Sequence, residues 1–212
     1  MKKLDLRQEY PQLYRSRVGQ VQEVMAPKLQ FIMVDGQGSP ESPAGAAAFE
    51  QAIQALYGLS FALKFACKQA GGPDYVVGPL EACWRMADDA DFDSARPADW
   101  RWTAMIMQPD FITSQEYALA LQKLQRTRPS AILNEVRLAV LEEGRSIQTM
   151  HQGPYDAEAP TLQRLADYAE AHGYAWNGDH HEIYLSDPRR TAPERLRTIL
   201  RRPVRAADTA CG

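Results

Sequence analysis

The residues best placed to do chemistry lie in one short segment, residues 180–186, which reads His-His-Glu-Ile-Tyr-Leu-Ser. Side chains of a β-strand alternate between its two faces, so His180, Glu182 and Tyr184 would share one face. A carboxylate beside a tyrosine on a sheet face can hold a cationic ligand by charge, or act as a base whose pKa is raised by burial. The spacing is also compatible with an ordinary solvent-facing glutamate, so both interpretations stay open.

The neighbouring histidines raise the question of a metal site. His180 and His181 would point to opposite faces of the expected strand, so both cannot bind one ion without distortion. Neither a His-x-His pair, an HExxH motif nor a cysteine lies near them. His151, on another expected strand, is better explained as a hydrogen-bonded structural residue. We therefore predict no metal site.

Aromatic residues gather around an expected hairpin in the first half of the chain. Trp84, Trp100 and Trp102 fall on its two strands, with Tyr75 at its start and Tyr57 on the preceding helix. Because Trp100 and Trp102 share a face, one side of that strand is strongly aromatic. Aromatic residues dominate protein cores, but aromatic walls with a few polar groups also form slots for planar or cationic ligands. Core packing and ligand binding both stay open.

Other functional classes find little support in the sequence. It contains no GxSxG motif, and its glycine pairs at residues 36–38 and 71–72 extend into neither a GxGxxG motif nor a Walker loop. The 24 Lys and Arg residues do not exceed the 27 Asp and Glu residues, so the basic surplus of a nucleic-acid binder is missing. An arginine-rich run over residues 189–205 has no interleaved aromatics. We expect no nucleic-acid partner.

Composition places the chain among ordinary globular proteins. It has 212 residues, of which 45% are hydrophobic and 24% charged, enough to bury a core without disulfides. Its three cysteines (Cys67, Cys83 and Cys211) form no CxxC pair, which is typical of a reducing compartment. The N-terminus lacks the apolar run of a signal peptide, and the most apolar stretch, residues 55–67, is interrupted by polar residues. We expect a soluble, cytoplasmic protein without a membrane partner.

Periodicity and turn residues predict the order of the elements. Residues 1–27 are polar and are expected to form an arm. Helices are expected over 44–69, 113–126 and 160–172, with a helical turn at 193–196. Strands are expected over 29–34, 75–86, 100–108, 136–141, 146–152, 182–185 and 199–204. The second and third strands would form a hairpin around an acidic turn at residues 88–93, and the fourth and fifth a hairpin around residues 142–145.

The two halves of the chain resemble each other in pattern. In the first half, residues 33–36 are followed by a proline and then by an expected helix. In the second half, residues 149–153 are followed by a proline and an expected helix in the same order. In each half a glycine-containing connection then leads to a strand with a glutamate, Glu81 or Glu182. The expected fold is α+β, with a strand–helix–strand–strand unit used twice, over about residues 28–128 and 136–204. Such units bury one sheet face under their helix and leave the other for pairing or for a cleft.

Several motifs are similar to those of a known family. They are Asp35-Gly36-Gln37-Gly38 with Phe49 and Leu56-Tyr57, Pro79-Leu80-Glu81 with Trp84, Trp102 with Pro109-Asp110-Phe111-Ile112, His151-Gln152-Gly153-Pro154-Tyr155, and residues 181–190. In these motifs the chain resembles the stand-alone GyrI-like (gyrase-inhibitor-like) small-molecule-binding proteins, over residues 28–204. The resemblance implies a tandem βαββ fold with pseudo-twofold symmetry and a ligand cleft between the halves, followed by a tail at 205–212. Only 27 residues precede the matching region, so we expect no fused DNA-binding module.

The resemblance also implies roles for particular residues. Glu182 matches the buried carboxylate of the cleft. The aromatic walls and their neighbours are matched by Tyr57, Trp84, Trp102 and Tyr184, with Tyr75 and Glu81 as further candidates. Arg85 stands where relatives often have a second aromatic residue, which is a departure from the family pattern.

Some stand-alone members of the family hydrolyse the strained cyclopropane of cyclopropanoid DNA-alkylating natural products. On that reading, Glu182 deprotonates a water aimed at the cyclopropane methylene, and a tyrosine hydroxyl, assigned to Tyr57, hydrogen-bonds the carbonyl that gathers negative charge. No metal or organic cofactor is required. The alternatives are a binder that sequesters or senses amphipathic, often cationic, compounds without turnover, and a protein that binds a protein partner such as gyrase.

Overall fold

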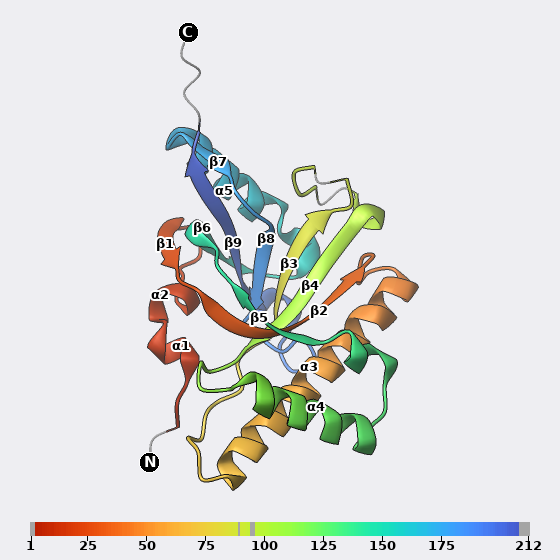
Figure 1. Cartoon of the computed structure of the whole chain (residues 1–212). Coiled ribbons are helices and arrows are strands. Elements are labelled where there is room, and N and C mark those ends of the chain that lie inside the picture. The colour runs from red at the N-terminus through yellow and green to blue at the C-terminus, as the bar shows by residue number, and fades with distance from the viewer. Residues whose placement is uncertain (1–2, 89, 94–95, 208–212) are drawn as a thin grey trace. The chain divides into compact units, whose positions relative to one another are not determined.

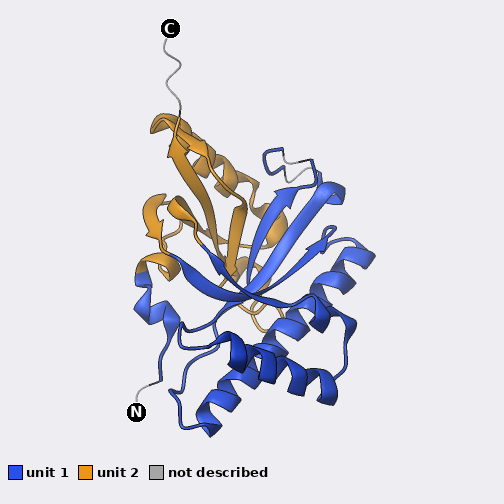
Figure 2. Cartoon of the chain, in the orientation of Figure 1, with its two compact units in different colours: residues 1–11, 28–141 blue, residues 12–27, 142–212 orange. Residues whose placement is uncertain are grey.

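The computed structural model of the chain describes residues 3–88, 90–93 and 96–207, and Figure 1 shows its helices and strands. The chain forms two compact units. Unit 1 comprises Met1–Pro11 and Lys28–Leu141, and unit 2 comprises Gln12–Pro27 and Glu142–Gly212 (Figure 2). Asp89, in the expected acidic turn, and the cysteine of the tail, Cys211, lie outside the described residues.

Unit 1 is built on an antiparallel sheet with the strand order β5-β2-β4-β3. Its strands are β2 (Leu29–Gln37), β3 (Glu81–Met86), β4 (Trp100–Met107) and β5 (Arg137–Leu141). Its helices are α1 (Leu6–Glu9), α3 (Pro43–Gln69) and α4 (Ser114–Thr127), with 3-10 turns η1 (Pro97–Asp99) and η2 (Ala131–Asn134). Phe49 of α3 packs on Trp84 and Trp102, so α3 covers the sheet face that carries these two rings.

Unit 2 is built on antiparallel strands in the order β1-β6-β9-β8, with a short strand, β7, paired with the end of β9. Its strands are β1 (Gln22–Ala26), β6 (Gly144–Gln152), β7 (Tyr174–Trp176), β8 (His180–Tyr184) and β9 (Arg197–Ala206). Its helical segments are α2 (Pro11–Tyr14), which starts at the boundary with unit 1, α5 (Ala159–Ala171), η3 (Tyr155–Ala157) and η4 (Pro193–Arg195). Leu165 and Ala169 of α5 pack with Ile147, Leu200 and Val204 of the sheet to form its core.

The two units share one arrangement of elements. Unit 1 contains β2-α3-β3-β4, and unit 2 contains β6-α5-β8-β9 with β7 inserted before β8. In both units the last of these three strands in the sequence lies between the other two, as β2-β4-β3 and as β6-β9-β8. The α+β class and the strand–helix–strand–strand order are therefore confirmed. A duplication with pseudo-twofold symmetry stays a prediction.

Capping residues fix where the helices begin and end. The Thr113 side chain accepts a hydrogen bond from the Glu116 amide while the Glu116 carboxylate accepts one from the Thr113 amide, which forms a capping box at α4. Ser42 caps α3, and Pro43 occupies its first position. Gly173 follows α5 with φ +65°, as predicted for a left-handed stop. The predicted helices are confirmed as α3, α4 and α5. In the described part of the chain, no helix has both the length and the apolar character of a bilayer span.

Three expectations about the strands and the arm need correction. The predicted hairpin over 136–152 is wrong, because β5 pairs with β2 whereas β6 pairs with β1 and β9. Strand β6 is buried on both faces from Ser146 to His151, so it requires a central place in a sheet rather than one local partner. The strand expected from residue 75 begins only at Glu81. Residues 1–27, expected as an arm, contain α1, α2 and β1, which are too short to give a clear period.

Candidate functional site

The candidate site is built around Glu182 in the middle of β8. Glu182 lies opposite Leu200 of β9 and exposes only 8% of its surface. The Nε2 atom of His180 lies 3.2 Å from Oε1 of Glu182, so the predicted sharing of one strand face by these residues is confirmed. His180 is itself buried. The solvent-facing alternative for Glu182 is therefore wrong, and its carboxylate is held by a buried histidine.

A second carboxylate, which the sequence did not single out, belongs to the same cluster. Glu158 is the N-cap residue of α5, but its side chain makes no capping hydrogen bond. Instead, Glu158, His180 and Glu182 each offer a donor atom, and these three atoms all lie within 4.8 Å of one another. The local sequence gives little signal for this residue, because its position depends on where the start of α5 lies beside β8.

The electrostatics of this cluster separate its two carboxylates. Burial, and then the negative charge of Glu182, raise the pKa of Glu158 well above its ordinary value. Two buried carboxylates at this separation cannot both be ionised cheaply, which favours the protonated form of Glu158. Two carboxylates and an imidazole are also donors that a divalent cation accepts. The hydrogen bond between His180 and Glu182, however, already occupies one donor atom of each residue.

Two tyrosine rings lie next to these acids. The rings of Tyr155 and Tyr184 meet edge to face, with centroids 5.7 Å apart. Burial, and then the charges of Glu182 and Glu158, raise the pKa of Tyr155 to about 12, so its hydroxyl stays protonated and available as a donor. Tyr184 was a predicted wall residue, whereas Tyr155 was noted only as part of the motif at residues 151–155.

His151 fixes the segment that carries Tyr155 and Glu158. Its Nδ1 lies 3.1 Å from the Thr161 hydroxyl oxygen, and its Nε2 lies 3.0 Å from the carbonyl oxygen of Pro154. These bonds tie β6 to the start of α5. The expectation that His151 is a satisfied structural residue is confirmed.

The opposite face of β8 carries a buried charge network. Glu143 accepts from Arg201 Nη1 at 2.8 Å and lies 3.0 Å from Nδ1 of His181. Arg201 also donates to the Gln148 side chain and to the Leu13 carbonyl. Burial opposes ionisation of Glu143, but the charges of His181 and Arg201 outweigh it and lower its pKa to about 2. The network locks β8 to β9 and thereby fixes the position of Glu182.

The predicted tryptophans lie in the core of unit 1. Trp84 and Trp102 expose 3% and 1% of their surfaces and contact the ring of Phe49, with centroids 5.5 and 5.1 Å away. The indole nitrogen of Trp102 donates to the Gly38 carbonyl oxygen at 3.2 Å. These contacts give both rings a packing role under α3. A part in ligand binding stays a prediction.

The other predicted residues of unit 1 occupy varied surroundings. Tyr75 is buried, its hydroxyl donates to the side chain of Gln108, and burial raises its pKa. Tyr57 is half-buried on α3 and stacks against Phe61. Glu81 is buried at the start of β3. All three belong to unit 1 and Glu182 belongs to unit 2, so their assembly around Glu182 stays a prediction.

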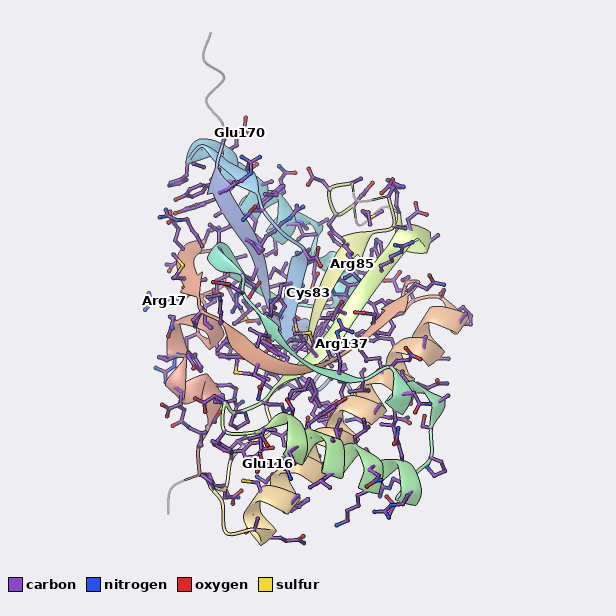
Figure 3. All side chains as sticks on the ribbon, viewed as in Figure 1. Arg17, Cys83, Arg85, Glu116, Arg137 and Glu170 are labelled. Carbon is purple, nitrogen blue, oxygen red and sulfur yellow. The ribbon has the colours of Figure 1, made fainter. Side chains whose placement is uncertain are left out.

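Arg85, the noted departure from the family pattern, belongs to a polar chain that crosses the sheet of unit 1. Arg137 of β5 binds both carboxylate oxygens of Asp35 on β2 at 2.8 and 3.0 Å. Thr103 of β4 donates to Asp35 at 2.6 Å and accepts from Arg85 of β3 at 3.0 Å. Figure 3 labels Arg85 and Arg137, the two ends of this chain. Arg85 is thus tied to the sheet by a hydrogen bond to its neighbouring strand.

Comparison with known proteins identifies the family to which the chain belongs. The sequence profile of the GyrI-like small molecule binding domain matches residues 19–205, and the chain belongs to this family. An uncharacterized conserved protein from Listeria innocua is 33% identical, with a TM-score of 0.86 over 96% of this chain and 100% of its own. A protein described as a hydrolase from Listeria innocua is 32% identical, with a TM-score of 0.82 and the same coverage. The C-terminal domain of EcmrR, 10% identical with a TM-score of 0.57 over 89% of this chain and 98% of its own, shares the fold. Comparison with curated proteins gave no match.

Proposed function

We propose that this GyrI-like protein is a hydrolase that opens the strained cyclopropane of cyclopropanoid DNA-alkylating compounds and so detoxifies them. The observation that carries the proposal is the buried Glu182 carboxylate, held by His180 and placed beside the rings of Tyr155 and Tyr184. Family membership supports the binding of a small molecule. Two solved structures described as a hydrolase from Listeria innocua, both 32% identical over 96% of this chain, support turnover.

The reaction follows from the chemistry of a carboxylate and a strained ring. Glu182 takes a proton from a water molecule, and the water oxygen forms a bond to the cyclopropane methylene. The ring carbon–carbon bond breaks, and its electron pair moves to the conjugated carbonyl oxygen, which a hydrogen-bond donor stabilises. In this proposal Trp84, Trp102 and Tyr184 are ligand-contacting residues and Tyr57 is a hydroxyl donor. The net change is the addition of one water molecule.

The test is incubation of the protein with a spirocyclopropane alkylator in water enriched in oxygen-18. We expect the ring-opened product to carry the label and to form much faster than without protein. Glu182→Gln should abolish this rate, because the amide cannot accept the water proton. Glu170→Gln, on the exposed surface of α5 in the same unit, is the matched control and should keep full activity. No labelled product with the unmodified protein contradicts the proposal.

A second candidate function is binding without turnover. A carboxylate next to two aromatic rings is also a site for a planar cation, and Tyr155 and Tyr184 offer such rings beside Glu182. Calorimetry with a planar cationic dye distinguishes the two functions. Binding that is weakened by Glu182→Gln, with no labelled product from any cyclopropanoid, would favour the binder.

A further inference from the structure

Glu158 carries a buried oxygen that has no partner in the structure. The residue exposes 7% of its surface, and its Oε1 atom makes no hydrogen bond. A buried polar atom left in this way ordinarily lowers the stability of the folded state. Such a cost is expected at sites where a ligand supplies the missing partner.

The backbone position of Glu158 makes this orientation unusual. An N-cap carboxylate ordinarily accepts a hydrogen bond from the first free amides of its helix, but the Glu158 side chain does not. Its backbone carbonyl accepts from the amides of Thr161 and Leu162, so Glu158 contributes to the start of α5 through its main chain and not through its side chain. The carboxyl group is instead directed to the cluster with His180 and Glu182.

The surrounding groups determine which of the two acids keeps the proton. Glu182 has a hydrogen-bond partner in the imidazole nitrogen of His180, whereas the buried Oε1 atom of Glu158 has none. Tyr155, which experiences the charges of both acids and of Asp187, also lies near the pair, while His151 is engaged by Thr161 and Pro154. Glu158, without a partner and beside the Glu182 charge, is therefore the group that stays neutral. A neutral carboxyl group has a hydroxyl to donate.

We propose that Glu158 acts as a neutral carboxylic acid that donates a hydrogen bond to the carbonyl oxygen of the bound molecule. This inference rests on the proposed hydrolysis, and it assigns a donor, in addition to the Tyr57 hydroxyl of that proposal, to the oxygen on which negative charge collects. Buried carboxylic acids can serve as oxyanion donors in this way.

The proton count closes over one cycle. Before the reaction the pair holds one proton, on Glu158. The attacking water gives a proton to Glu182, and Glu158 gives its proton to the product oxygen as the carbon–carbon bond breaks. The pair again holds one proton, now on Glu182, and its transfer to Glu158 restores the starting state. No oxidant, reductant or cofactor takes part.

Infrared difference spectroscopy tests the protonation directly, without relying on turnover. We expect the carbonyl stretch of a protonated carboxyl group in the unmodified protein at neutral pH, and we expect it to shift when a conjugated ketone such as an open-chain dienone binds. Glu158→Gln should remove the band, whereas Glu170→Gln should keep it. Absence of the band, or a band that persists in Glu158→Gln, overturns the inference.

Turnover gives the second readout. Glu158→Gln keeps an N–H donor, so we expect a fall in kcat of about tenfold or less and the loss of the alkaline limb that deprotonation of Glu158 causes. Glu158→Leu lacks any donor, and we expect a fall of about 10² to 10³. Equal losses in the two variants, or an alkaline limb unchanged in Glu158→Gln, contradict the donor role. Thermal melts of both variants separate these effects from misfolding.

The outcomes also separate this inference from the proposed function and from a metal site. Turnover without the infrared band overturns the inference and leaves the hydrolase proposal standing. The band without turnover of any cyclopropanoid overturns the hydrolase, and the ligand-induced band shift then tests the hydrogen bond alone. Calorimetry with Zn²⁺ and with Mn²⁺ tests the metal site. Tight binding of either ion that is lost in Glu158→Gln, together with disappearance of the infrared band when the ion is added, would show that Glu158 binds a cation. It would overturn the inference that Glu158 is a neutral acid.

Discussion

Nε2 of His180 lies 3.2 Å from Oε1 of Glu182, two residues along the same strand and on the same face. A strand places residues i and i+2 side by side, so this contact needs no distant element to form. The contact orients the buried carboxylate of Glu182. His180 is therefore a positioning residue for Glu182.

His180→Ala should lower turnover of a cyclopropanoid without unfolding the protein. A hydrogen bond to a charged group contributes about 1.5–3 kcal/mol, so we expect a fall in kcat of about tenfold or more. KM should change little, because His180 orients the base and does not hold the ligand. His180→Asn, whose amide can still donate to Glu182, should recover part of the rate. An unchanged kcat for His180→Ala would show that Glu182 needs no orientation.

Glu143→Gln should strongly destabilise the protein. Glu143 joins Arg201 and His181 in a buried network, and removing its charge leaves the Arg201 guanidinium uncompensated. Breaking a buried ion pair in this way costs about 3–5 kcal/mol. The measurement is the free energy of unfolding by urea, with the exposed Glu170→Gln as the control for a lost surface carboxylate. A cost below about 1 kcal/mol would mean that the network contributes no more than a surface pair.

Glu143 should also make stability depend on acid pH. Its folded pKa of about 2 lies below the ordinary value of 4.5, so the folded state binds the proton less tightly than the unfolded state. Its contribution is therefore complete above about pH 4.5 and is lost as the pH falls towards 2. The free-energy difference between the unmodified protein and Glu143→Gln should shrink between pH 6 and pH 3. A difference that stays constant over this range would contradict the lowered pKa.

Some of these residues could be placed from the sequence and others could not, depending on whether their position is fixed by neighbours in the chain or by distant elements. The shared face of His180 and Glu182 follows from strand alternation, which is local, and it was predicted. Glu143 was placed in a hairpin turn, because the pattern of β5 and β6 does not reveal that each pairs with other strands. Glu158 was missed, because only the packing of α5 on the sheet brings it to Glu182. The core position of Trp84 could not be predicted from its own segment, because the ring that it packs against belongs to Phe49, 35 residues earlier in the chain.

Gly36 should resist substitution because of the ring that covers it. Gly36 lies opposite Trp102 in the β2–β4 register, and a Cβ atom added there would come 2.1 Å from the Trp102 ring. Gly36→Ala must therefore displace this ring from its place against Phe49. Overpacking of this kind costs about 1–3 kcal/mol, which a urea titration would measure together with a change in tryptophan fluorescence.

Gly58→Ala is the matched control for this substitution. Gly58 lies inside α3, and the nearest atom to an added Cβ, on Leu124, is 3.6 Å away, an ordinary contact. Alanine favours a helix interior by about 1 kcal/mol over glycine, so we expect this variant to be more stable than the unmodified protein. The two substitutions add the same methyl group with opposite expected signs. If Gly36→Ala matched the unmodified protein in stability and fluorescence, the Trp102 ring would not be fixed over β2 as the structure describes.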